Sequence, residues 1–73
     1  MPGLVHKLHV SVNGSLMEIV EGTTVSDLLK ILEIGNVPVA VEQNLEIVSK
    51  SDYSTRTINQ GDKIEIVHFV GGG

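Results

Sequence analysis

Hydrophobic and polar residues alternate at the beginning of the chain with the period of a half-buried strand. Across residues 4–12 most even positions are apolar and most odd positions are polar. Because the side chains of a strand alternate between two faces, this pattern predicts a strand over residues 4–12. Its core-facing side chains are expected to be Leu8, Val10 and Val12.

A tight hairpin is predicted at Asn13-Gly14, because both central positions of a type I′ turn need a positive φ. A two-residue loop there fixes how the second strand pairs with the first. The expected partners are Val12 with Ser15, Val10 with Met17, and Leu8 with Ile19. In this register Met17 and Ile19 join the buried face, and Leu16, Glu18 and Val20 lie on the other face.

A short amphipathic helix is predicted after Glu21-Gly22. Thr24 suits the N-cap, and Asp27 in the first turn favours the positive end of the helix dipole. We expect the helix to stop at Gly35-Asn36, with Pro38 preventing its continuation. The apolar stripe that would pack on the core falls at helical spacing: Val25, Leu28, Leu29 and Leu32.

The second half of the chain contains further strand signals separated by turns. Pro38 suggests an edge or the start of a strand, Gln43-Asn44 a turn, and Gly61-Asp62 the last turn. Residues 49–60 are polar and are expected to be irregular. The predicted strands are 37–42, 45–48 and 63–70. In the last strand Ile64, Ile66 and His68 are expected on one face of the sheet, and Glu65, Val67 and Phe69 on the other.

This order of elements predicts an α+β fold in which one main helix packs across one face of a mixed sheet. The first and last strands are expected to lie side by side in the middle of the sheet, in parallel. That is the ubiquitin-like β-grasp arrangement. It implies a single β-grasp domain over residues 1–70 and a flexible C-terminal glycine tail over residues 71–73.

Composition excludes several classes of function. A chain of 73 residues is too short for a large enzyme core, and the absence of cysteine excludes disulfides, thiolate metal clusters and thiol nucleophiles. Its net charge of −4 opposes binding to nucleic acid or to anionic membranes. The longest apolar run is too short to span a bilayer, and the N-terminus lacks a basic region followed by an apolar stretch and a cleavage site, so we expect no signal peptide. We therefore expect a cytoplasmic protein.

Residues for catalysis or metal binding are sparse. No serine lies in a nucleophile-elbow motif, and the three histidines form no recognisable triad order. His6 and His9 would face opposite sides of a strand, so they could not chelate one ion. The acidic residues are scattered over turns and outward positions, without the pairing that acid–base catalysis needs. We predict no metal site, no bound cofactor and no enzymatic activity.

The C-terminus is the unusual part of the chain. Three successive glycines follow the last strand, although glycine loses more backbone entropy on ordering than any other residue. A slender extension could carry the Gly73 carboxylate into a narrow active site of another protein, with Gly71 and Gly72 giving access. The alternative is a disordered end without a role. Val67, Phe69 and Val70 precede the glycines, and exposed apolar side chains there predict a docking surface.

The sequence resembles the ThiS family, the sulfur carrier proteins of thiamin biosynthesis. The specific part is the closing motif GDKIEIVHFVGGG over residues 61–73. Ser49 departs from the pattern, since many relatives carry proline there, and this affects only a loop. The MoaD family of molybdopterin synthesis shares the Gly-Gly end but differs before it. The other matching segments are residues 12–14, 24–29, 39–44 and 46–48.

The resemblance implies a carrier that is a co-substrate and not a catalyst. A ThiF-like enzyme would use ATP to adenylate the Gly73 carboxylate. Sulfur delivered through a cysteine desulfurase would then convert it to a thiocarboxylate, which a ThiG-like thiazole synthase would accept. Val67 and Phe69 would help to dock these partners.

Two alternatives remain open at this point. The chain could donate sulfur to molybdopterin, tRNA thiolation or cysteine synthesis. It could instead be a ubiquitin-like modifier or interaction module.

Overall fold

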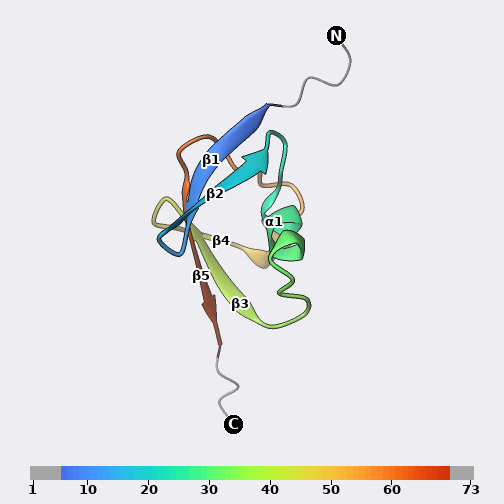
Figure 1. The fold of residues 1–73 in the computed structure, drawn as a ribbon. Coiled ribbons are helices and arrows are strands. Elements are labelled where there is room, and N and C mark those ends of the chain that lie inside the picture. Colours follow the sequence, from blue (N-terminus) through green and yellow to red (C-terminus); the bar gives the residue numbers. More distant parts are fainter. Residues whose placement is uncertain (1–5, 70–73) are drawn as a thin grey trace.

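Five strands form one mixed sheet, and one helix crosses a single face of it (Figure 1). The computed structural model describes residues 6–69. The strands follow the order β2-β1-β5-β3-β4 across the sheet. In chain order the elements are β1 (Lys7–Val12), β2 (Ser15–Val20), α1 (Val25–Ile31), β3 (Val39–Gln43), β4 (Glu46–Val48), the 3₁₀ helix η1 (Lys50–Asp52) and β5 (Lys63–His68).

The first and last strands lie side by side in the middle of the sheet, as predicted. β1 runs antiparallel to β2 and parallel to β5, where Ser11 and Val12 face Lys63 and Ile64. β3 is antiparallel to both β5 and β4. The predicted β-grasp fold class is therefore confirmed. The predicted domain boundary at residue 70 lies outside the described residues and stays a prediction.

The hairpin between β1 and β2 has the predicted register. Val12 pairs with Ser15, Val10 with Met17 and Leu8 with Ile19. Asn13 has φ 50° and Gly14 has φ 83°, the positive values that a type I′ turn requires. Residues 4 and 5 of the predicted first strand lie outside the described part, and β1 begins at Lys7.

The helix begins as predicted but ends earlier. Thr24 accepts a hydrogen bond from the Asp27 amide, and the Asp27 carboxylate accepts one from the Thr24 amide, which forms a capping box. Hydrogen bonding of the Asp27 carboxylate to Thr24, chiefly to its backbone amide, holds the pKa of Asp27 below its usual value. The stop at Gly35-Asn36 was wrong, because α1 ends at Ile31.

Glu33 supplies the helix stop. It takes a positive φ of 57°, and its amide donates to the Lys30 carbonyl, while the Ile34 amide donates to the Leu29 carbonyl. This pair of bonds is a Schellman motif, in which glycine is the usual residue at the left-handed position. The prediction placed the helix end at Gly35 because glycine is the usual residue at the left-handed position, whereas Glu33 occupies that position here.

Two predictions for the second half of the chain need correction. The turn after β3 is at Asn44-Leu45, with φ values of 54° and 69°, so Gln43 is the buried last residue of a strand. Residues 49–60 are also not uniformly irregular and polar. They contain η1, and Ile58 from this segment is only 1% exposed in the core.

The core lies between α1 and the sheet face that carries the alternate apolar side chains. Leu28 is fully buried there, and Leu29, Leu32 and Tyr53 are partly buried around it. Within residues 6–69 no helix is long and apolar enough to cross a membrane. The buried apolar residues are Val10, Val12, Ile19, Val25, Leu28, Val41, Val48, Ile58, Ile64 and Ile66.

Candidate functional site

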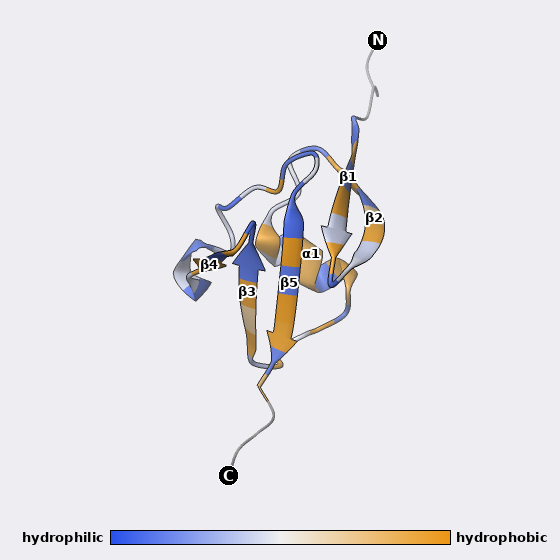
Figure 2. Cartoon of the chain, turned by 90° about the vertical axis from the view of Figure 1, so that its left-hand side faces the viewer, coloured by the Kyte–Doolittle hydropathy of each residue, from blue (hydrophilic) through white to orange (hydrophobic). Residues whose placement is uncertain are grey.

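The end of β5 carries the predicted docking residues on the sheet face opposite α1. Ile64 and Ile66 are buried beneath the helix, whereas Val67 is 60% and Phe69 58% exposed. Figure 2 looks onto this face and shows hydrophobic residues along β5 toward the C-terminus. Exposure of Val67 and Phe69 is thus confirmed.

The predicted reacting group lies outside the described residues. Gly71, Gly72 and Gly73 follow the described part of the chain, as does Val70. The structure nevertheless shows how the strand that leads to them is held. The question for this site is therefore what fixes the position and direction of β5.

Asn13 holds β5 at the point where β1 ends. Its side-chain Oδ1 accepts a hydrogen bond of 2.7 Å from the Ile66 amide, and its Nδ2 donates one of 3.2 Å to the Ile66 carbonyl. The Asn13 backbone amide donates to the Ile64 carbonyl at 2.8 Å. One side-chain amide therefore extends the parallel pairing beyond the last residue of β1, as a peptide group would.

β3 holds the other edge of β5 along its whole length. The register runs from Gln43 opposite Ile64 to Val39 opposite His68. One step beyond, the Phe69 amide donates to the Pro38 carbonyl at 3.1 Å. Proline lacks an amide hydrogen but keeps its carbonyl, so it fits just before β3, as its predicted place at a strand start requires. β5 is therefore paired up to the last described residue.

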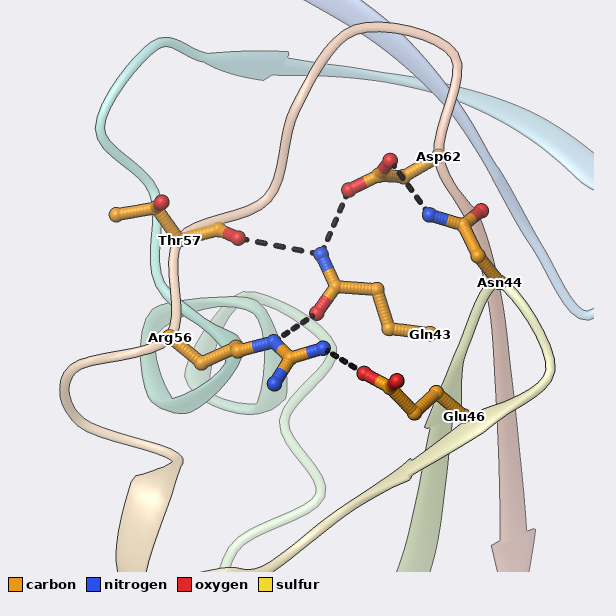
Figure 3. A network of polar contacts seen from close by, with 6 residues as sticks. All are labelled: Gln43, Asn44, Glu46, Arg56, Thr57 and Asp62. Atoms are coloured by element: carbon orange, nitrogen blue, oxygen red, sulfur yellow. Dashed lines mark hydrogen bonds and ion pairs between the residues drawn. The ribbon is translucent and has the colours of Figure 1, made fainter.

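A buried polar network fixes the beginning of β5 (Figure 3). The Asp62 carboxylate accepts hydrogen bonds from Gln43 Nε2 at 2.6 Å, from the Asn59 amide at 2.8 Å and from Asn44 Nδ2 at 2.9 Å. Gln43 Nε2 also donates to the Thr57 carbonyl at 3.1 Å. The network therefore joins the end of β3 to the loop that precedes β5.

Arg56 closes the network on its outer side. Its Nε donates to Gln43 Oε1 at 2.8 Å, and a terminal nitrogen donates to the Glu46 carboxylate at 2.7 Å. Gln43 therefore donates through its nitrogen and accepts through its oxygen, so its buried amide is satisfied. This arrangement explains how a polar side chain can lie in the core layer.

The environment of Asp62 favours its ionised form. Burial is the largest influence and opposes ionisation, but the hydrogen bonds from Asn44, the Asn59 amide and Gln43 outweigh it together. With the positive charge of Arg56, they hold the pKa of Asp62 below its usual value. Sequence reasoning missed this network. Gln43 gave the one signal, since it alternates with Val39 and Val41 and so had to face inward.

Outside this network, two histidines lie near glutamates on the surface. His6 lies 3.8 Å from Glu21, and His9 lies 3.3 Å from Glu18. Lys7 also contacts Glu18, at 3.6 Å. In the part of the chain that the structure describes, no group of three His, Asp or Glu residues could hold a metal ion.

Comparison with known proteins identifies the family. The model of the ThiS family matches residues 10–73. The sulfur carrier protein ThiS of Bacillus subtilis is 48% identical over 50 residues, which cover 68% of this chain and 76% of that protein. The crystal structure of the thiamine biosynthesis protein ThiS from Geobacter metallireducens has a TM-score of 0.74 and 31% identity. That match covers 90% of this chain and 100% of the other.

A second kind of relative is much longer. A protein named thiazole synthase from Paramagnetospirillum magneticum is 48% identical over 62 residues, which are 85% of this chain. The matched region is only 19% of that protein, and 20% of a thiazole synthase from Magnetococcus marinus. The chain thus spans about a fifth of these two proteins. From the family match and the shared fold, the chain belongs to the ThiS family.

Proposed function

We propose that this chain is a sulfur carrier of thiamin biosynthesis whose working group is the carboxylate of Gly73. The family match that extends to residue 73 is the observation that carries this proposal. The chain itself is a co-substrate that other enzymes modify. The body of the domain supplies a rigid strand, β5, and an exposed apolar face beside it.

The chemistry needs a carboxylate that can be activated. A ThiF-like enzyme transfers AMP from ATP to the Gly73 carboxylate, and pyrophosphate leaves. A persulfide supplied through a cysteine desulfurase then attacks the acyl adenylate through its outer sulfur, and AMP leaves. A second thiol cleaves the resulting acyl disulfide, which releases the thiocarboxylate and leaves a disulfide between the two thiol sulfurs. The ionised sulfur of the thiocarboxylate is a good nucleophile, for the same reason that a thiolate is better than a thiol. ATP is bound by the partner enzyme and not by the carrier.

The acceptor that we propose is a thiazole synthase. Support comes from the two proteins of that name in which about a fifth of the chain resembles this one. Joining a carrier segment and a synthase in one polypeptide raises their effective concentration, which suits partners that act together. Val67 and Phe69 are exposed at the end of β5, close in sequence to the C-terminus, and would contact each partner enzyme in turn.

Extension of the chain by one residue tests the proposal. A residue added after Gly73 moves the carboxylate away from the position that the adenylating enzyme and the synthase recognise. We expect loss of thiazole formation in an assay reconstituted from carrier, adenylating enzyme, ATP, sulfur source and synthase. Circular dichroism and urea unfolding should be those of the wild type, because the added residue is separate from the strands and helix described within residues 6–69.

The matched control carries one additional residue before Met1, so that both variants have the same length. It should support thiazole formation at the wild-type rate. If the C-terminally extended chain retained full activity, the role of the Gly73 carboxylate would be refuted.

A further inference from the structure

Two glutamates face each other on the exposed side of the sheet. Glu42 on β3 is the register partner of Glu65 on β5. The Asn44 amide donates to the Lys63 carbonyl, and the Phe69 amide donates to the Pro38 carbonyl. Hydrogen-bonded pairs alternate with non-hydrogen-bonded pairs along β3 and β5, so every second register pair between these two positions is hydrogen-bonded. Glu42 and Glu65 form one of these pairs, which places their Cα atoms about 5.5 Å apart. Their side chains therefore leave the sheet side by side.

This pairing is unfavourable for the isolated domain. Like charges directly opposite each other destabilise an antiparallel pair, and both glutamates are half-buried. The ion pairs found among residues 6–69 use Glu18, Glu21 and Glu46, and none of them includes Glu42 or Glu65. Stability of the domain alone therefore does not explain this pair.

Apolar side chains lie beside the two carboxylates and toward the end of β5, whereas Asn44 and Lys63 form the next pair toward its start. Lys63 takes part in none of the ion pairs found among residues 6–69. Ile47 lies opposite Glu42 on its other side and is 72% exposed. Ala40 and Val67 form the next pair along the strands, followed by Phe69. This face half-buries its two carboxylates and exposes large apolar side chains beside them, a combination that is typical of an interaction surface. We define the docking patch as Glu42, Ile47, Glu65, Val67 and Phe69.

We propose that the docking patch receives a cationic side chain of the thiazole synthase, which lies between the carboxylates of Glu42 and Glu65 while neighbouring apolar groups of the synthase cover Ile47, Val67 and Phe69. Arginine suits this place best, since its planar guanidinium can bind two carboxylates at once. The cation relieves the repulsion between the glutamates only in the complex. The two charges therefore favour the bound state over the free one.

This inference rests on the proposed function and names the chemistry of its partner surface. Glu65 precedes Gly73 by eight residues, which span at most about 29 Å when fully extended. The proposed cation is a docking contact on β5 and takes no part in the chemistry at Gly73. Loss of the carboxylate pair should weaken binding without changing the chemistry at the C-terminus.

The test compares the double variant Glu42→Gln/Glu65→Gln with the wild type. Glutamine keeps the size of the side chain and removes its charge. The control variant, Glu21→Gln/Glu33→Gln, has the same net charge but changes exposed residues outside the patch. Affinity for the thiazole synthase of the same organism is measured by calorimetry at several salt concentrations, and stability by urea unfolding. Thiocarboxylate formation is measured by intact mass.

We expect the patch variant to bind the synthase about tenfold more weakly at low salt, with a flatter dependence on salt than the wild type. Its urea midpoint should be equal to or higher than that of the wild type, because the repulsion is gone. The control should bind like the wild type. Equal affinity and equal salt dependence of patch variant and wild type would overturn the inference.

Two other outcomes separate this inference from its premise. Sedimentation that detects a wild-type dimer, lost in the patch variant, would assign the patch to a second copy of this chain and overturn the partner proposed here. Failure of the wild type to form a thiocarboxylate would instead reject the proposed function. A normal thiocarboxylate with unchanged synthase affinity of the patch variant rejects the docking contact alone.

Discussion

Replacement of Asp62 by alanine tests whether the polar network fixes the beginning of β5. The carboxylate is buried and accepts three hydrogen bonds, from Gln43, Asn44 and the Asn59 amide. Alanine removes all three at once and leaves the fold of the neighbouring strands otherwise unchanged. The effect on stability therefore measures the network and not the packing of the core.

The expected loss of stability depends on whether each of the three donors finds another acceptor when the Asp62 carboxylate is removed. Gln43 keeps its bond to the Thr57 carbonyl, and Asn44 is exposed, so water can replace its partner. The Asn59 amide loses a bond to a charged acceptor, which is worth about 1.5–3 kcal/mol. Removing the carboxylate also removes its desolvation penalty, which reduces the loss of stability. The lost hydrogen bond from Gln43 increases that loss. We expect Asp62→Ala to lower the free energy of unfolding by about 2–4 kcal/mol.

The effect should depend on pH with a defined sign. Because the folded-state pKa of Asp62 is lowered, its ionised form stabilises the fold above its unfolded pKa of about 3.9. That contribution is lost as the pH falls through the lower, folded pKa. The difference between wild type and Asp62→Ala should therefore be constant from neutral pH to about pH 5, and shrink below about pH 4.

Urea unfolding followed by circular dichroism at pH 7 and at pH 3 measures both quantities. Asp52→Ala is the control, because Asp52 is exposed, and it should change stability by less than about 0.5 kcal/mol. A loss for Asp62→Ala below about 1 kcal/mol at pH 7, or one that grows in acid, would refute this account of the network.

Three further predictions concern the core, the support of β5 and the docking face. Leu28→Ala should lower the free energy of unfolding by about 2–5 kcal/mol in urea, since it opens a cavity at a fully buried position, and a much smaller loss would contradict that placement. Asn13→Gly keeps the turn but removes both side-chain bonds to Ile66, so amide exchange of Ile66 should accelerate; unchanged protection would show that these bonds contribute nothing. Phe69→Asp should leave stability within about 0.5 kcal/mol and weaken binding to the adenylating enzyme, whereas unaltered affinity would exclude Phe69 from the docking face.

Local signals predicted the first half of the chain well, because each depends on few residues close in sequence. Asn13-Gly14 fixed the hairpin register through its need for positive φ, and Thr24 with Asp27 fixed the helix start. The helix end was placed too late since Glu33, a residue that seldom adopts a positive φ, takes the left-handed position.

The parts that sequence reasoning missed depend on contacts between distant residues. Gln43 looked like a turn residue, and its burial becomes favourable through Asp62, nineteen positions away, Arg56 and the Thr57 carbonyl. Ile58 looked like a single apolar residue in a polar segment, yet the loop folds it into the core. The pairing of Glu42 with Glu65 likewise follows from the register of β3 against β5, which no local pattern contains.

The intact mass of the chain after reaction tests the central proposal most directly. The chain is incubated with the ThiF-like enzyme, ATP and a sulfur source, and fragmentation locates any change along the sequence. We predict replacement of one oxygen by one sulfur at Gly73, dependent on ATP and reversed when thiazole synthase and its substrates are added. An unchanged mass, or a chain joined to lysines of other proteins, would contradict the role as a sulfur carrier.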